Sequence, residues 1–233
     1  MKTLPLLAHL EELRRRLAVS LGAVAVLLVP SYYWVAPEVV RWLGRLAGRP
    51  LRTIGLAEAF FLRLEIALLA ACLLALPIVA REAWAFVAPG LYPEERRATG
   101  GLALASTLLA AAGALFALGF LIPVTIGFFL AEAGEMGVEY LAGAESIART
   151  ALLLTAACAA AFQLPLALLA LARAGIATPA WLKHTRRQWI VGIFLLSAIL
   201  TPTSDLFTMT ALALPMCLLF EATRIAIGRM PRA

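Results

Sequence analysis

The sequence predicts an all-α membrane protein with six transmembrane helices. Of its 233 residues, 63% are hydrophobic and 15% are charged, and the mean hydropathy is +0.91. An average soluble domain is roughly half apolar and about a quarter charged. The basic residues lie in short clusters beside the apolar runs, which is how topology signals are arranged and argues against nucleic acid as a partner. Residues 1–233 are therefore expected to form a single polytopic membrane domain.

Six apolar runs define the expected helices, because a helix needs roughly 20 apolar residues to cross a bilayer. The runs cover residues 17–36, 60–79, 101–129, 150–171, 189–200 and 206–227. The fifth run extends only about 18 Å at 1.5 Å per residue. It must be lengthened by its flanks, lie in a thinned bilayer or be shielded by neighbouring helices. Five prolines that interrupt the runs are expected to kink them: Pro30, Pro77, Pro123, Pro165 and Pro215.

The segments between the runs predict an orientation and one additional helix. The first run follows a charge-rich helical segment, His9 to Arg16. This run lacks a small-residue cleavage site, which predicts a retained anchor. With the amino terminus inside, fourteen of the twenty Lys and Arg residues are cytoplasmic, so both termini are expected there. Arg41, Arg45 and Arg49 recur every four residues and predict an amphipathic surface helix. This helix either lies in the lipid interface or caps the bundle.

Residues suited to catalysis are scarce. The chain has one Asp, two separated His, no Gly-rich phosphate loop and no nucleophile beside a base. Cys72, Cys158 and Cys217 lie in different apolar runs without metal-ligand spacing, so they are interpreted as packing residues. We therefore expect neither an enzyme nor a cofactor.

Carboxylates near the cytoplasmic boundary are the first candidates for a binding site. Glu12 precedes Arg16 by four residues, so it forms either a helix-surface ion pair or part of a site. Glu94 and Glu95 follow Pro93, where a negative charge complements the helix dipole. These carboxylates also face the cytoplasm, where they can receive an arginine pair.

Three further polar residues belong to the apolar runs or their turns. Gln163 lies two residues before Pro165 and needs hydrogen bonds from the bundle or from water. Asp205 is placed to cap the last helix, and Glu221 is placed to reach the cytoplasmic interface. If these three residues lined a pathway, the protein would be a small-solute secondary transporter. The lack of an internal repeat and the few embedded charges argue against that alternative.

The residues from His9 to Leu17, HLEELRRRL, resemble the amino-terminal motif of the TatC family. The resemblance continues in the family's order over nearly the whole chain. The matching positions are Glu58 to Phe61, Leu76-Pro77, Trp84 to Tyr92, Glu95 to Arg97, Gly113, Phe116, Pro123, Phe162 to Pro165, Arg186-Arg187, Thr201-Pro202, Asp205, Pro215 and Glu221.

This resemblance implies a cup-shaped bundle of six helices with short fifth and sixth helices and both termini in the cytoplasm. It implies a receptor subunit in the cytoplasmic (inner) membrane that binds twin-arginine signal peptides of folded cargo. The expected partners are single-span TatA and TatB type subunits, further copies of the same chain and the lipid bilayer. Transport is expected to use the proton-motive force.

The resemblance also implies which residues bind the signal peptide. Glu12 and Glu95 match the carboxylates that read the two arginines, and the surface around them is formed by Leu10, Arg14, Phe86, Pro89 and Arg97. Carboxylates accept a planar guanidinium at two points, whereas lysine offers only a point charge.

Three positions differ from the family pattern. Gln163 stands where the family commonly has an acidic residue, so a proton-carrying role there is not implied for this chain. Ala59 replaces a proline before the paired phenylalanines, and Glu65 replaces a basic residue. Gln163, Asp205 and Glu221 remain candidates for a role in the membrane or its loops.

Overall fold

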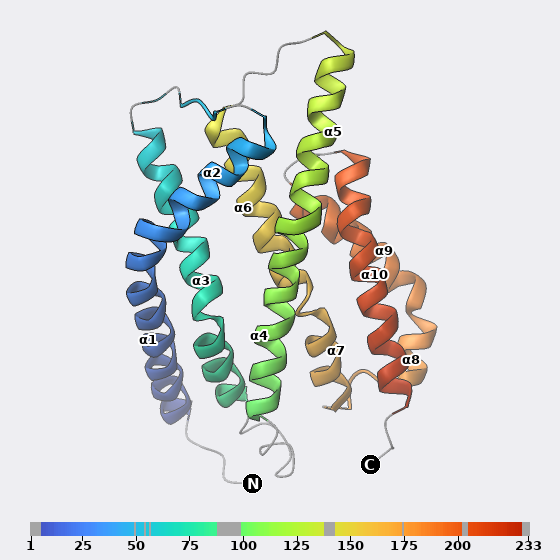
Figure 1. Cartoon of the computed structure of the whole chain (residues 1–233). Helices are drawn as coiled ribbons and strands as arrows, with labels where there is room; N and C mark the ends of the chain where they lie inside the picture. Colours follow the sequence, from blue (N-terminus) through green and yellow to red (C-terminus); the bar gives the residue numbers. More distant parts are fainter. Residues whose placement is uncertain are drawn as a thin grey trace. The chain divides into compact units, whose positions relative to one another are not determined.

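The computed structural model describes residues 6–48, 50–53, 55, 57–87, 99–137, 143–173, 175–201 and 205–229. Regular structure in these ranges is helical apart from one isolated bridge between Arg52 and Gly143, which confirms the all-α prediction. The helices are drawn in Figure 1. They are α1 (Leu6–Pro30), α2 (Ala36–Leu46), α3 (Glu58–Val87), α4 (Thr99–Phe116), α5 (Ile122–Glu135), α6 (Ala144–Ala161), α7 (Leu164–Arg173), α8 (Pro179–His184), α9 (Arg186–Leu200) and α10 (Leu206–Gly228), with π-helical segments η1 (Ser31–Val35) and η4 (Ala117–Leu121).

Five helical stretches of the described residues are long and apolar enough to cross a membrane. They are His9–Leu46, Glu58–Phe86, Gly100–Glu135, Ala144–Arg173 and Leu206–Gly228. The fifth predicted run lies in α9, whose 15 residues reach about 22 Å, so this helix is short as expected. The sixth predicted run lies in α10, whose 23 residues reach about 34 Å and make it the shortest of these five stretches.

The structure divides into two compact units. Unit 1 comprises Met1–Val39 and Arg63–Leu108, and unit 2 comprises Val40–Leu62 and Leu109–Ala233.

In unit 1, α1 and the η1 segment that continues it run antiparallel to α3 and contact it at both ends. His9 stacks on Phe86 at one end, with ring centroids 4.4 Å apart. At the other end Arg63 Nε donates a hydrogen bond to the Tyr32 carbonyl oxygen at 2.9 Å. Several apolar side chains of α1 remain exposed, including Val26 at 72%, as suits a helix surrounded by lipid.

Prolines lie beside the irregular points of the long helices. Pro30 is followed directly by η1, and Pro123 follows η4. The kink predicted at Pro165 is a break, since α6 ends at Ala161 and α7 starts at Leu164. Proline has no N–H to donate to the preceding turn, so the helical hydrogen-bond ladder is interrupted there.

The predicted amphipathic helix is α2. Leu43 is fully buried, whereas Arg41 and Arg45 are exposed. Arg49 lies outside the described residues. The amphipathic pattern is thus confirmed, and the choice between an interfacial helix and a cap stays a prediction.

Unit 2 is built around α10. One stripe of this helix is buried at every fourth residue, at Thr208, Leu212, Met216 and Phe220. Phe220 stacks with Trp189 of α9, with centroids 5.7 Å apart. Such a stripe is what a helix needs in order to pack against several neighbours.

Candidate functional site

Glu12 lies on α1 and is held by a guanidinium from its own helix. Arg16 donates to Glu12 Oε1 from Nη2 at 2.6 Å and from Nε at 3.0 Å. The third contact of Arg16 crosses to α3, where Nη1 donates to Glu82 Oε2 at 3.1 Å. The predicted Glu12–Arg16 ion pair is therefore present, and it extends into a cluster of one cation between two carboxylates.

All three side chains of this cluster are partly shielded from solvent. The exposed fractions are 23% for Glu12, 16% for Arg16 and 16% for Glu82. Arg81 lies 4.0 Å from Glu82 Oε1, but its side chain is 79% exposed. The Arg81 contact is accordingly weak, and the strong contacts are those of Arg16.

The hydrogen bonds of the cluster change the affinity of its groups for protons. Those from Arg16 lower the pKa of Glu12 below the ordinary value of 4.5, and those accepted by Glu12 raise the pKa of Arg16. Both residues precede the first apolar run, residues 17–36. Because its pKa is lowered, Glu12 stays ionised at neutral pH and presents a full negative charge.

The structure brings together only part of the predicted surface. His9, Glu12 and Arg16 share one face of α1, and Phe86 stacks on His9. Leu10 and Arg14 are exposed one helical turn apart from each other, on a different face of α1. Pro89, Glu95 and Arg97 lie outside the described residues, so the predicted pairing of Glu12 with Glu95 stays a prediction.

Glu82 was missed by the sequence reasoning, as was its link to Arg16. The available signal was local: Glu82 precedes Phe86 by four residues and shares its face of α3. A carboxylate on the same helix face as a predicted site residue is a reasonable candidate for that site.

Asp205 and Glu221 have defined contacts at opposite ends of α10. Asp205 caps the helix as predicted, since its Oδ1 accepts a hydrogen bond from the Thr208 N–H at 2.6 Å. Glu221 has ion pairs that the sequence did not predict, and its place at the cytoplasmic interface stays a prediction. It accepts hydrogen bonds from Arg186 of α9 and from Arg224, the latter at 2.7 and 3.0 Å.

Gln163, Asp205 and Glu221 lie at separate points of unit 2 and do not form one cluster. The 16 residues between Asp205 and Glu221 correspond to about 24 Å along α10. Gln163 lies in the turn between α6 and α7. No group of three His, Cys, Asp or Glu residues in the described parts of the chain is arranged to hold a metal ion.

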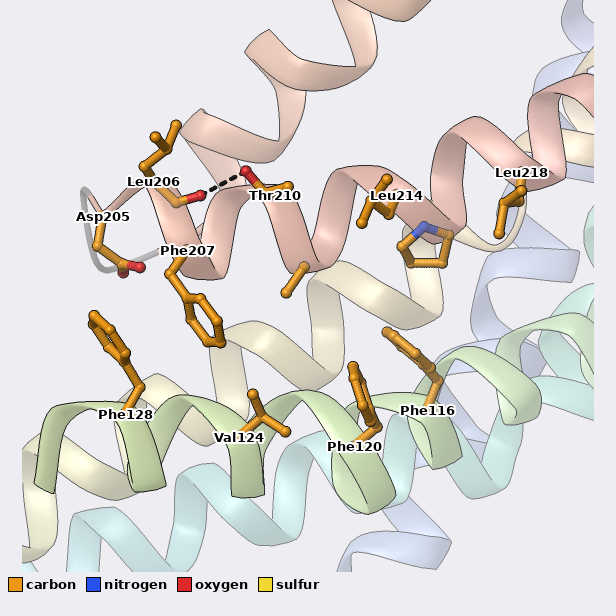
Figure 2. Close-up of a pocket in the computed structure, with 12 residues that line it drawn as sticks. Phe116, Phe120, Val124, Phe128, Asp205, Leu206, Phe207, Thr210, Leu214 and Leu218 are labelled. Carbon is orange, nitrogen blue, oxygen red and sulfur yellow. Dashed lines mark hydrogen bonds between the residues drawn. The ribbon is translucent and has the colours of Figure 1, made fainter. Parts of the chain in front are cut away.

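Unit 2 contains an apolar groove of about 790 Å³, shown in Figure 2. Phenylalanines from α4, η4 and α5 point toward α10, and Phe128 stacks on Phe207 with centroids 4.7 Å apart. Its lining residues are Phe116, Phe120, Val124, Phe128, Asp205, Leu206, Phe207, Thr210, Ala211, Leu214, Pro215 and Leu218. Gln163 is not among them.

Comparison with known sequences gives a consistent result. The family model described as Sec-independent protein translocase protein (TatC) matches residues 8–215. The Sec-independent protein translocase protein TatC of Azotobacter chroococcum mcd 1 is 36% identical over 228 residues, covering 94% of this chain and 87% of that protein. Its counterpart from Escherichia coli K12 is 33% identical over 226 residues, covering 94% and 86%.

Solved structures agree with the sequence comparison. A crystal structure of the twin-arginine translocase receptor TatC superposes with a TM-score of 0.79 at 31% identity, covering 94% of this chain and 98% of that one. A second crystal structure of this receptor, in DDM, gives a TM-score of 0.81 with the same identity and coverage.

Proposed function

Because the chain belongs to the TatC family and is thus a subunit of the Sec-independent protein translocase, we propose that it captures twin-arginine signal peptides at a surface containing Glu12 and Glu95. Captured cargo proteins are then exported in the folded state, with the proton-motive force as the energy source. The single-span partners are subunits of the TatA and TatB type, and several copies of this chain assemble in the receptor complex.

The observation that carries this proposal is the guanidinium already held by Glu12. Two N–H groups of Arg16 donate to one oxygen of that carboxylate, at 2.6 and 3.0 Å. This is the chemistry that a signal-peptide arginine requires, and charge-assisted bonds of this kind are about twice as strong as neutral ones. Lysine lacks the planar fork and binds such a carboxylate at one point only.

The proposed location is the cytoplasmic (inner) membrane, with both termini in the cytoplasm. The excess of Lys and Arg on that side supports this orientation. It places Glu12 at the inner water boundary, where a signal peptide arrives before transport. The helical stretches that are long and apolar enough to cross a bilayer support a multi-pass arrangement.

Roles for the remaining candidates follow from their contacts. We assign Asp205 to holding the start of α10 and Glu221 to joining α9 with α10. The membrane face around Gln163 is proposed to accept the apolar part of the signal peptide. The amide of Gln163 does not ionise at physiological pH, so proton coupling is assigned to another group.

Peptide capture by the full-length protein in lipid nanodiscs tests the proposal. Glu12→Ala and Glu95→Ala are each expected to weaken binding of an Arg-Arg signal peptide on the order of tenfold, since each removes a charge-assisted contact. Glu11→Ala is the matched control, because Glu11 is exposed and lies on another face of α1. Unchanged capture by the Glu12→Ala/Glu95→Ala double variant would exclude this surface as the receptor site.

A further inference from the structure

The carboxylate proposed to receive a signal-peptide arginine already accepts two hydrogen bonds from Arg16 of its own helix. Arg16 offers the same group that the peptide offers, a planar guanidinium with several N–H donors. It contacts Glu12 through Nη2 and Nε and contacts Glu82 through Nη1. An incoming arginine must therefore share Glu12 with Arg16 or replace it.

We infer that Arg16 is an internal competitor for Glu12 and that Glu82 is the alternative partner that allows Arg16 to release it. Together these two residues set how tightly the receptor binds any cationic ligand that uses Glu12. This inference rests on the proposed function, in which Glu12 binds a signal-peptide arginine.

The position of Glu82 lowers the free-energy cost of moving Arg16 away from Glu12. Arg16 is only 16% exposed, so losing Glu12 without a replacement would leave a shielded cation unpaired. Glu82 lies 3.1 Å from the opposite side of the same guanidinium and keeps Arg16 paired after it leaves Glu12. The stack of His9 on Phe86 holds α1 against α3, one turn from Glu82 along α3 and two turns from Arg16 along α1.

Competition of this kind has a quantitative signature. The apparent affinity of a ligand falls by the fraction of protein in which the site is open. That fraction is a property of Arg16 and Glu82, so it is the same for an Arg-Arg and a Lys-Lys peptide. Removing the competitor raises the apparent affinities for the Arg-Arg and Lys-Lys peptides by one common factor. Removing a direct peptide contact changes these two affinities unequally.

The test titrates Arg-Arg and Lys-Lys signal peptides into the full-length protein in nanodiscs. Arg16→Gln is expected to tighten both peptides by the same factor, about three- to tenfold. Arg15→Gln is the matched control, because Arg15 is exposed on the same helix and loses the same charge. Arg16→Lys keeps the charge but loses the fork, so it tightens binding by a smaller common factor.

Glu82 is tested in two backgrounds. When Arg16 is present, Glu82→Gln is expected to weaken binding of both peptides by a common factor. Arg16 then has no alternative carboxylate and stays hydrogen-bonded to Glu12. In the Arg16→Gln background, Glu82→Gln has no more effect than Glu11→Gln, which removes a charge from an exposed position. A Glu82 effect that persists without Arg16 would mean direct peptide contact and would overturn the inference.

Two further results separate this inference from the proposed function. If Glu12→Ala weakens capture but Arg16→Gln and Arg16→Lys leave it unchanged or weaker, the competitor role fails and the receptor site stands. If the Glu12→Ala/Glu95→Ala double variant captures the peptide as wild type does, the receptor site itself fails. Thermal unfolding of each variant shows whether it is folded. If Arg16→Gln does not fold, the peptide affinities of Arg16→Lys decide whether Arg16 competes for Glu12.

Discussion

Gly113 of α4 lies directly against the backbone of Cys158 of α6. A Cβ atom on Gly113 would fall 2.4 Å from the Cys158 carbonyl oxygen and 2.8 Å from its carbonyl carbon. One turn further along, Phe116 and Phe162 have ring centroids 5.9 Å apart. The two helices meet here through backbone contact, which membrane helices achieve with small residues.

Gly113→Ala is therefore expected to destabilise the protein by about 1–3 kcal/mol. The added methyl group would clash with the backbone of Cys158, so α4 and α6 would have to move apart. Gly127→Ala on α5 is the matched control, since no atom lies within 4 Å of its added Cβ. Alanine also favours helix more than glycine does, so the control is neutral or slightly stabilising. The measurement is thermal unfolding in detergent, and equal stability of the two variants would contradict the close packing.

Asp205→Ala should destabilise the start of α10 by about 0.5–2 kcal/mol, because the Thr208 N–H loses its capping acceptor. Asp205→Asn should retain most of the stability, since asparagine caps helices about as well as aspartate. Hydrogen exchange at the first turn of α10 reports the effect. Equal protection in wild type and Asp205→Ala would show that the cap does not hold this turn.

The sequence was sufficient for features that depend on neighbouring residues. The apolar runs located the long helices because each run must bury its backbone hydrogen bonds in lipid. The cap at Asp205 followed from local chemistry, and Pro165 was predicted to kink the helix, which is in fact broken there. Helix ends were harder to predict: α3 ends at Val87 and not at residue 79, because charged residues continue the helix beyond its apolar part.

The missed features depend on distant parts of the chain meeting. Glu82 joins Arg16 across 66 residues, and Arg186 joins Glu221 across 35. No helical period connects such pairs, since each depends on the register of two packed helices. The i to i+4 rule accordingly gave Glu12–Arg16 but neither of the longer links.

The Arg186–Glu221 pair should couple α9 and α10 only weakly. The Arg186 side chain is 53% exposed, so the pair is screened by water and contributes about 0–1 kcal/mol. A double-mutant cycle with Arg186→Ala and Glu221→Gln, read by thermal unfolding, measures the coupling. A coupling energy well above this range would show that the pair is more important to the α9–α10 contact than its exposure indicates.

The lowered pKa of Glu12 predicts how stability depends on pH. Arg16 donates hydrogen bonds to the ionised carboxylate, so the folded-state pKa lies below the ordinary value of 4.5. For a group whose pKa is depressed on folding, the stabilisation is complete above the unfolded-state pKa and is lost as the pH falls through the folded-state pKa. Wild type should therefore unfold at a higher temperature than Glu12→Gln above about pH 5, and this difference should shrink as the pH falls below about 4.5.

Glu11→Gln, which changes an exposed carboxylate on another face of α1, should show a smaller difference from wild type across the range. A Glu12→Gln difference that grows on acidification would mean that Arg16 does not stabilise the charged form of Glu12.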